Sequence, residues 1–250
     1  MTLQAQGNST NINTNIALTT GQTSTDQMSP VAGTFDLTSD TQGSHIRGTV
    51  SGDLSPLIDT PISALKRAGR IDLTLDATRA VDNTTHLRTL SLTSDVLSLN
   101  GALNLDETGW PTALDITANV EPGVLAQDLA KSGFDATQLG RGQFSLRYDQ
   151  SLGQAWALDA SFDNVTFSEI AATTVTATGR GTIQDQSISG TLNSSMGNVT
   201  ATGALSDLLQ GNVTLNTGFA YGDGTGVTIS GLNLTTPATQ FRAGIRTDPA

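Results

Sequence analysis

The stretch that most constrains the fold is residues 86–106, HLRTLSLTSDVLSLNGALNLD. Leu90 and Leu92 alternate with polar residues, and the alternation resumes on the other parity after Ser94 and Asp95. Alternation with a period of two is typical of a β-strand that has one apolar face and one solvated face. A turn between neighbouring strands changes the parity in this way, so the stretch predicts two adjacent strands joined by a turn.

Similar alternation runs through most of the chain and predicts an all-β protein. Hydrophobic residues make up 36% of the chain and charged residues 14%. A disordered chain usually combines low hydrophobicity with many charges and no pattern, whereas here the charges are few and the apolar residues are patterned. A change of parity at Val165 and Phe167 also predicts a bulge or turn near Asp163 and Asn164.

Two segments interrupt the strand pattern and predict short helices. Apolar residues recur at helical spacing near residues 57–68, where we expect a helix over 61–68, and again over 124–132. Residues 1–30 are the most polar part of the chain, and we interpret them as a partly disordered lead-in or a ragged first strand. Residues 31–250 then form one continuous repetitive β domain.

Glycine recurs inside the predicted strands, and this recurrence favours a sheet that is folded sharply across its width. TVTATG at residues 174–179 and NVTATG at residues 198–203 are near copies about 24 residues apart, a period typical of a stacked array. We predict an elongated, sharply bent antiparallel sheet and keep a β-solenoid as the alternative. The glycines concerned are Gly48, Gly52, Gly101, Gly179, Gly190, Gly203 and Gly231.

The inward positions of the strands are mostly aliphatic, and aromatic residues make up only 4% of the chain. A filled core would usually contain bulkier side chains, whereas a long groove lined by aliphatic rows would not. Each buried CH₂ contributes about 0.8 kcal/mol, so an acyl chain of about 16 carbons would gain roughly 10 kcal/mol if fully buried. The alternative is that the same residues pack against each other as the core of a sandwich or a β-helix. We expect the groove to be lined by Ile71, Leu73, Leu75, Leu90, Leu92, Leu97, Leu99, Leu103, Leu114, Ile116, Val120, Phe144, Leu146, Leu158, Val199, Ala201 and Leu205.

The net charge of −11 and the isoelectric point of about 4.3 narrow the classes of partner. Such an acidic chain is disfavoured as a binder of nucleic acid, which needs a basic face, and of anionic lipid headgroups. The N-terminus lacks the basic and apolar regions of a signal peptide, and no apolar run is long enough for a membrane helix. Because the chain begins and ends within the strand pattern, we expect it to be a segment of a longer protein.

No pattern of catalytic or metal-binding residues stands out in the sequence. The two histidines, His45 and His86, lie beside strand residues and turns, far from any combination of nucleophile, base and orienting group. Aspartate is common at the predicted turns, where its side chain usually caps the backbone. We therefore expect no enzyme, no cofactor and no metal site.

Three segments resemble a known family. They are SALKRAGRIDLTLDA at residues 63–77, TLSLTSDVLSLNGALNLDE at residues 89–107 and ALDITANVEPG at residues 113–123. Strands of this kind, interrupted by short amphipathic helices, resemble the C-terminal half of the TamB family, the translocation and assembly module proteins of diderm bacteria. That family is related to AsmA-like and bridge-like lipid transfer proteins. The resemblance spans about residues 30–250 and rests on the strand pattern and the Leu-x-Leu…Asn-Gly-x-Leu phrase.

The resemblance implies a β-taco, or half-pipe, with a hydrophobic interior that holds phospholipid acyl chains. It implies a periplasmic location, within a parent protein that is anchored in the inner membrane and reaches an Omp85-family outer-membrane barrel (TamA-like). The implied function is movement of phospholipids between the inner and outer membranes and support of outer-membrane protein assembly. The alternative function is that of a structural β-solenoid in a secreted adhesin or autotransporter passenger.

Overall fold

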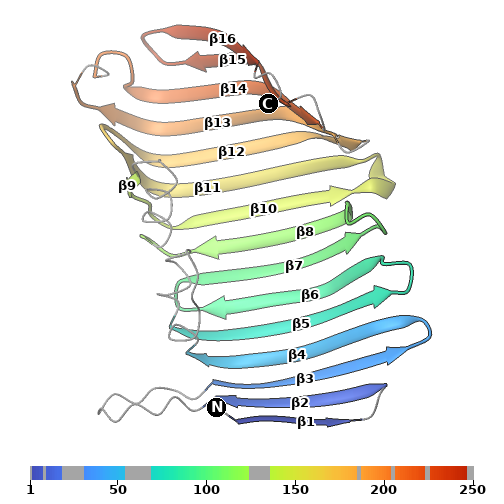
Figure 1. Cartoon of the computed structure of the whole chain (residues 1–250). Helices are drawn as coiled ribbons and strands as arrows, with labels where there is room; N and C mark the ends of the chain where they lie inside the picture. Colours follow the sequence, from blue (N-terminus) through green and yellow to red (C-terminus); the bar gives the residue numbers. More distant parts are fainter. Residues whose placement is uncertain are drawn as a thin grey trace, which may run out of the picture. The chain divides into compact units, whose positions relative to one another are not determined.

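The computed structural model describes residues 2–7, 10–18, 31–53, 69–123, 136–184, 187–203, 206–222 and 226–246. Nearly all of these residues lie in β-strands, and every strand pair whose register is defined is antiparallel (Figure 1). This confirms the prediction of an all-β, antiparallel protein. The chain divides into two compact units, residues 1–118 and 119–250. The prediction of one continuous domain over residues 31–250 stays a prediction.

The first unit is a sheet whose strands lie side by side in chain order. Each strand pairs with the strands next to it in sequence, and no pairing among the described residues joins β1 to β8. Two of these strands, β1 and β2, fall within the predicted polar lead-in. The strands are β1 (Thr2–Gly7), β2 (Asn11–Leu18), β3 (Val31–Asp40), β4 (Gly43–Asp53), β5 (Arg70–Ala80), β6 (Thr85–Ser94), β7 (Leu97–Leu105) and β8 (Pro111–Val120), the last of which crosses the unit boundary.

The second unit is likewise a sheet in chain order from β10 to β16, and the short strand β9 pairs with the end of β11. A single turn of 3-10 helix, Gln150–Leu152, joins β10 to β11. The predicted helices near 57–68 and over 124–132 lie outside the described residues. The strands are β9 (Ala136–Gln138), β10 (Gly142–Asp149), β11 (Ala155–Phe167), β12 (Ile170–Gln184), β13 (Ser187–Ala201), β14 (Gly211–Gly222), β15 (Gly226–Thr235) and β16 (Gln240–Arg246).

The two strands predicted from residues 86–106 are present as β6 and β7. Ser94 closes the turn between them, because its hydroxyl oxygen accepts hydrogen bonds from the backbone N–H groups of Val96 and Leu97, at 3.3 and 3.0 Å. The same hydroxyl donates to the Leu97 carbonyl at 3.0 Å. The parity change across Ser94 and Asp95 therefore marks a turn, as predicted.

Residues in the left-handed backbone region interrupt the ladders of the second unit. Asn164 has a φ of 49° and lies between the paired residues Asp163 and Val165, but β11 continues through it and the β11–β12 register does not shift, so the bulge or turn predicted there is not found. Asn198 in β13, with a φ of 48°, and Gly231 in β15, with a φ of 61°, lie at register shifts. Interruptions of this kind bend a strand and increase its local twist. Among the glycines expected to bend the sheet, Gly231 has this role.

The antiparallel ladders exclude the β-solenoid alternative, because the coils of a β-helix stack through parallel strands. The near copies at residues 174–179 and 198–203 fall on the neighbouring antiparallel strands β12 and β13, where Thr174 pairs with Gly197. The interpretation of these copies as rungs of a stacked array is therefore wrong. Both segments are rich in threonine and valine because these residues suit the pleated surface of a half-exposed strand.

Few apolar side chains are fully buried, and the two units differ in how many they contain. In the described part of the first unit, the buried ones are Val31 and Ile71, of which Ile71 is only 1% exposed. The second unit contains three buried residues, Ala172, Val199 and Val213, that pack together as a cluster. Its other buried apolar residues are Val120, Leu139, Tyr148 and Trp156.

Candidate functional site

The strands of the first unit place their apolar residues on one face, which we call the leucine face. It consists of three rows that run across β3 to β7, because directly opposed residues of antiparallel strands point to the same side of the sheet. None of its fifteen positions carries a polar or ionisable side chain. The rows are Gly33–Val50–Leu73–Leu92–Leu99, Phe35–Gly48–Leu75–Leu90–Gly101 and Leu37–Ile46–Ala77–Leu87–Leu103.

Two glycines of the leucine face are covered by larger neighbours. The ring of Phe35 lies directly over Gly48, in the space that a Cβ at this position would need. A Cβ at Gly101 would lie 3.2 Å from Cγ1 of Ile116, so Ile116 in β8 extends the same face by one strand. Pairing a large side chain with a glycine levels the surface in the way that alternating large and small residues do in a packed layer.

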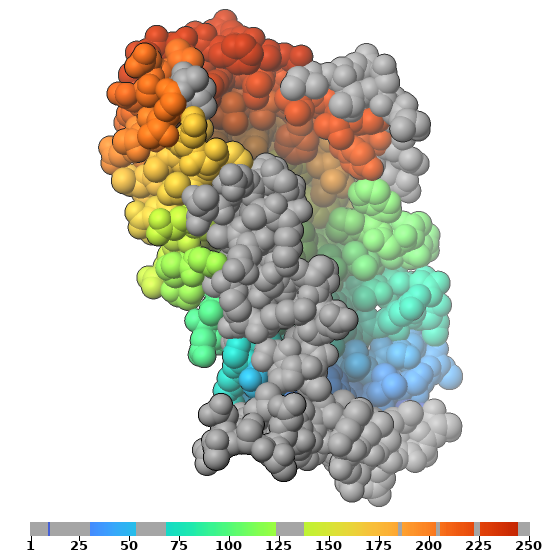
Figure 2. Space-filling model, turned by 60° about the vertical axis from the view of Figure 1, so that its left-hand side comes forward, coloured from blue at the N-terminus to red at the C-terminus, as the bar shows by residue number. Residues whose placement is uncertain are grey.

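The leucine face is largely half-buried. Leu37 is 38% exposed, Gly48 is buried, and the other thirteen positions are half-buried. Side chains of successive strands lie in contact along the stack, coloured from blue to green in Figure 2. Part of the aliphatic surface is therefore shielded by lateral neighbours, and part stays accessible. An accessible aliphatic surface loses contact with water when an apolar ligand covers it, which is favourable.

The opposite face of the same strands is polar and charged. Its residues form a row of hydroxyl and amide side chains, a row containing Asp36, Arg47 and Asp76, and a row containing His45 and His86. Asp76 accepts a hydrogen bond from His45 at 3.0 Å and pairs with Arg47 at 3.2 Å. The hydrogen bond from His45, together with the positive charges of Arg47 and Arg88, lowers the pKa of Asp76. The three rows of the leucine face are thus uncharged, whereas the opposite face of the same strands carries charged side chains.

Most of the residues that we expected to line a groove in the first unit lie on or beside the leucine face. Ile71 lies one row beyond it, paired with Ser94, and is buried. Leu97 is half-buried beside the β6–β7 turn, and Leu114 shares the parity of Ile116 in β8. Val120, at the end of β8, is buried and belongs to the second unit. The remaining six, Leu73, Leu75, Leu90, Leu92, Leu99 and Leu103, form part of the three rows.

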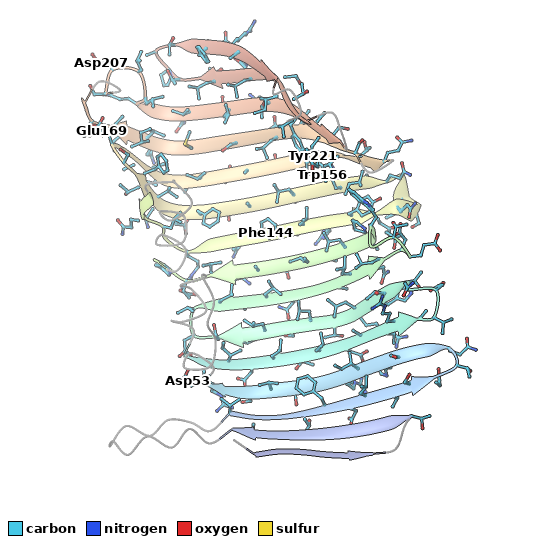
Figure 3. All side chains as sticks on the ribbon, viewed as in Figure 1. Asp53, Phe144, Trp156, Glu169, Asp207 and Tyr221 are labelled. Carbon is cyan, nitrogen blue, oxygen red and sulfur yellow. The ribbon has the colours of Figure 1, made fainter. Side chains whose placement is uncertain are left out.

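The second unit does not assemble its expected residues into a comparable face. Leu146 pairs with Leu158, but the same row continues through Gly179 on β12 and ends at Thr217 on β14. Phe144, in the middle of β10 (Figure 3), lies in a row that Ser194 interrupts. From Phe144 the row runs through Ala160, Ala177, Ser194, Leu215 and Leu234 to Phe241. Val199 is 2% exposed within the cluster of Ala172 and Val213. Ala201 pairs with Ile170, and Leu205 lies outside the described residues.

Trp156 fills the space that this second unit would otherwise leave open. Its indole lies across Gly179 and Gly190 on the two neighbouring strands, where a Cβ would overlap the ring. Its Nε1–H donates a hydrogen bond to the Ser189 carbonyl at 3.0 Å, and its ring centroid lies 5.6 Å from that of Phe219. Figure 3 places Trp156 at the same end of the strands as Tyr221 and opposite the end that carries Glu169 and Asp207.

Sequence reasoning missed several residues of the leucine face. The alternation in β3 and β4 could have identified four of them, because Phe35 and Leu37 share one parity and so do Ile46 and Val50. Leu87 has the opposite parity to Leu90 and reaches the same face only through a β-bulge at Arg88, because Thr89 pairs with Asp76 and Leu87 with Ala77. The missed side chains are Phe35, Leu37, Ile46, Val50, Ala77 and Leu87.

No family model, curated protein or solved structure matches this chain. Within the residues that the structure describes, no three metal-ligating side chains come together. A separate search of the same residues finds no helix with the length and apolar character needed to span a membrane.

Proposed function

We propose that this chain is a segment of a hydrophobic-groove protein of the TamB type that carries phospholipids between the inner and outer membranes. The observation that carries the proposal is the leucine face, an aliphatic surface across β3 to β7 that is half-accessible and has no ionisable side chain. In this proposal the sheet curves as a β-taco, or half-pipe, with the leucine face inside.

The length and chemistry of the leucine face suit acyl chains. Adjacent strands are about 4.8 Å apart, so the five strands of a row place their side chains along roughly 19 Å. A chain lying along the rows meets mostly leucine, valine, isoleucine and phenylalanine side chains, and Phe35 and Ile116 lie next to two of the glycines. Each CH₂ removed from water contributes about 0.8 kcal/mol, so even partial burial of one acyl chain offsets the cost of ordering it.

The wider setting follows from the resemblance and is also proposed. The parent protein is anchored in the inner membrane, extends through the periplasm and meets an Omp85-family partner at the outer membrane, where it supports outer-membrane protein assembly. This segment works without a catalytic group or a cofactor, because movement along an apolar surface requires no covalent chemistry. The alternative function as a solenoid adhesin loses its support, since the antiparallel ladders exclude the fold on which it rested.

The test is to place a charge on the leucine face without unfolding the sheet. We expect Leu99→Asp and Ile116→Asp to abolish phospholipid transport between donor and acceptor vesicles, because the ionised carboxylate interrupts the apolar path. Thr74→Asp, on the polar face of the same unit, is the matched control and should transport normally. Mass spectrometry of gently purified wild-type protein should detect bound phospholipid. Absence of bound lipid together with active Asp variants would contradict the proposal.

A further inference from the structure

A hollow of about 450 Å³ lies across the ends of β11, β12 and β13 in the second unit, where the short strand β9 pairs with β11 (Figure 1). Its volume is within the range of small-ligand sites. The polar side chains that line it are amides and hydroxyls, and none of the described residues in its lining is ionisable. The hollow therefore offers hydrogen bonds to a ligand without offering a charge.

Four residues of the lining form one row of the ladder and lie on one face of the sheet. Gln138 of β9 pairs with Thr166 of β11. Thr166 pairs with Ala171 of β12, which in turn pairs with Thr200 of β13. Directly opposed residues point to the same side of a sheet. This side is the solvated one, because Gln138 and Thr200 are exposed, whereas Val199 beside Thr200 is only 2% exposed.

A second row, two residues along each strand, borders the hollow from the same side. Counted from the paired residues around them, Asn164 lies opposite Thr173, and Thr173 lies opposite Asn198. The Nδ2–H group of Asn198 donates a hydrogen bond to the Thr173 hydroxyl at 3.1 Å, so these two side chains meet on one face. All three residues are exposed and line the hollow. The two rows therefore bring three amide groups and three hydroxyl groups to one site.

The backbone departs from regular strand geometry at both asparagines of the hollow. Asn164 and Asn198 have φ values of 49° and 48°. At Asn198 the strand also has a bulge, because Gly197 and Asn198 together lie opposite Asn212 of β14. The backbone N–H of Asn198 donates to the Asn212 side chain at 3.4 Å. Bulges and left-handed residues other than glycine are both more frequent at functional sites than elsewhere.

Most hydrogen-bonding groups of the hollow are available to a ligand. The side chains of Gln138, Asn164 and Thr200 make no hydrogen bond with the residues that the structure describes. Asn198 uses one N–H group on Thr173 and keeps its carbonyl oxygen. Because amides and hydroxyls supply both donors and acceptors, a matching ligand must itself both donate and accept.

We propose that this hollow binds a neutral carbohydrate. A sugar presents several hydroxyl groups, each of which donates and accepts hydrogen bonds, and it has no charge that needs a counter-ion. An anion would find no cationic side chain in the lining and would meet a chain with a net charge of −11. A metal cation would find no carboxylate there. The lining therefore favours a neutral polyhydroxyl ligand over either kind of ion.

A second hollow extends the site along the sheet. Its volume is about 530 Å³, it shares Asn198 and Thr200 with the first, and it continues past Gln210 to Gly211 at the start of β14. The row from Gln138 to Thr200 already crosses four strands, which places its ends roughly 14 Å apart. We therefore expect an oligosaccharide, whose successive rings can contact successive strands, to bind more tightly than a single sugar. The site lies in the second unit and does not involve the leucine face.

The experiment titrates the whole chain with two neutral trisaccharides, chitotriose and maltotriose, and follows the amide signals of residues 164–173 and 198–202 by NMR. We expect saturable shifts at these residues. Chitotriose should bind more tightly, because each of its acetamido groups adds one donor and one acceptor that match the asparagine and glutamine side chains. Equal affinities would assign recognition to the ring hydroxyls. The absence of saturable shifts with both trisaccharides would overturn the proposal.

Three variants test whether the two rows hold the sugar. Asn164→Gly and Asn198→Gly remove an amide and still allow the left-handed backbone, and each should weaken binding about threefold to tenfold, the loss expected for a hydrogen bond. Thr200→Val removes a hydroxyl with little change of shape and should also weaken binding. The matched control is Asn83→Gly, the same change at a left-handed residue (φ 72°) between β5 and β6, and it should leave the affinity unchanged. An equal loss in the control and in Asn164→Gly would contradict the proposed site.

Discussion

The two units have the same pattern of alternating strands, but their apolar faces are packed differently. In the first unit the face is a set of rows of half-buried leucines, levelled by glycines that lie under Phe35 and Ile116. In the second unit the corresponding surface is interrupted by glycine and threonine, and its bulk is supplied by Trp156 and by the cluster around Val213. Alternation of apolar and polar residues therefore specifies a two-faced sheet, but it does not specify whether the apolar face is filled.

The difference has a physical cause in where the small residues lie. Gly181 and Gly190 pair directly in the second unit, Gly179 lies two residues from Gly181, and one indole covers all three. The left-handed residues Asn164 in β11 and Asn198 in β13 also interrupt the ladders that these strands form. Asn164 precedes Val165, which pairs with the buried Ala172, and Asn198 precedes the buried Val199. In the ladders from β3 to β7 of the first unit there is a single bulge, at Arg88, and the leucine rows continue across it.

The largest expected effect comes from placing the same charge in the two regions. We predict that Val213→Asp destabilises the second unit by more than about 3 kcal/mol, because the 0% exposed valine offers no water to the carboxylate. Leu92→Asp, on the half-buried leucine face, should cost only about 1–2 kcal/mol. Hydrogen exchange of the β13–β14 and β5–β6 amides measures the two effects separately. Equal losses of stability in the two variants would mean that the leucine face is as inaccessible to water as the cluster around Val213.

Removal of the indole should have the next largest effect. Trp156→Ala deletes a 7% exposed side chain and leaves a void over Gly179 and Gly190, so we expect a loss of about 3–5 kcal/mol. Trp110→Ala, which truncates a half-buried residue beside the β7–β8 turn, is the control and should cost about 1 kcal/mol. Chemical denaturation followed by circular dichroism measures both. A loss at position 156 no larger than at position 110 would contradict the filling role of Trp156.

A single methyl group distinguishes the two regions more finely. Gly190→Ala places a Cβ against the Trp156 ring and the Arg180 carbonyl, and we expect it to cost about 1–3 kcal/mol. Gly101→Ala places a Cβ 3.2 Å from Cγ1 of Ile116 and 3.4 Å from the Asp115 carbonyl oxygen, which is less crowded than at Gly190, and should cost about 0.5 kcal/mol or less. Thermal unfolding of the two variants makes the comparison. A cost at Gly101 equal to that at Gly190 would show that the leucine face packs rigidly.

As the pH is lowered, the first unit should lose stability at a higher pH than the second. This is the smallest of the four predicted effects on stability. Hydrogen bonds from Ser51, His45 and the threonines at 84 and 108 lower the pKa values of four aspartates below their ordinary value of 3.8. A carboxylate with a lowered pKa stabilises the fold above the ordinary value, and this contribution is lost as the pH falls through the lowered one. The described part of the second unit contains one such group, Asp149. The four are Asp72, Asp76, Asp82 and Asp106.

Amide exchange measured while the pH is lowered from about 5 to about 2 tests this order. The β5–β7 amides should lose protection at a higher pH than the β12–β14 amides. The matched variant is Asp76→Asn, which keeps the shape of the side chain and removes its titration, and should reduce the pH dependence of the first unit. Simultaneous loss of protection in both units would contradict the prediction.

Local pattern was enough to predict the strands and the turn at Ser94. The parity change at Ser94 marks the β6–β7 turn, because side-chain parity in a strand is strictly alternating, whereas the change at Val165 follows the left-handed residue Asn164 with no bulge in the β11–β12 register. The bulge at Arg88 is equally visible in the sequence, since Leu87 and Leu90 differ in parity. The alternating run that begins at Leu90 does not include Leu87 and therefore does not contain this parity change.

Long-range features could not be predicted in the same way. The meeting of Trp156 with Gly190 depends on a register across three strands, which single-strand periodicity does not contain. The near copies at 174–179 and 198–203 were misread for the same reason, because sequence similarity between neighbouring strands does not distinguish antiparallel pairs from stacked coils.

The central claim is that the leucine face is accessible to acyl chains, and paramagnetic NMR tests it directly. The chain, with its leucine and valine methyl groups labelled with ¹³C, is mixed with a phospholipid that carries a nitroxide on its acyl chain. We predict strong broadening of the methyl signals of Leu73, Leu92 and Leu99, with those of Val199 and Val213 unchanged. Unchanged leucine signals, or equal broadening of the two valines, would contradict the claim.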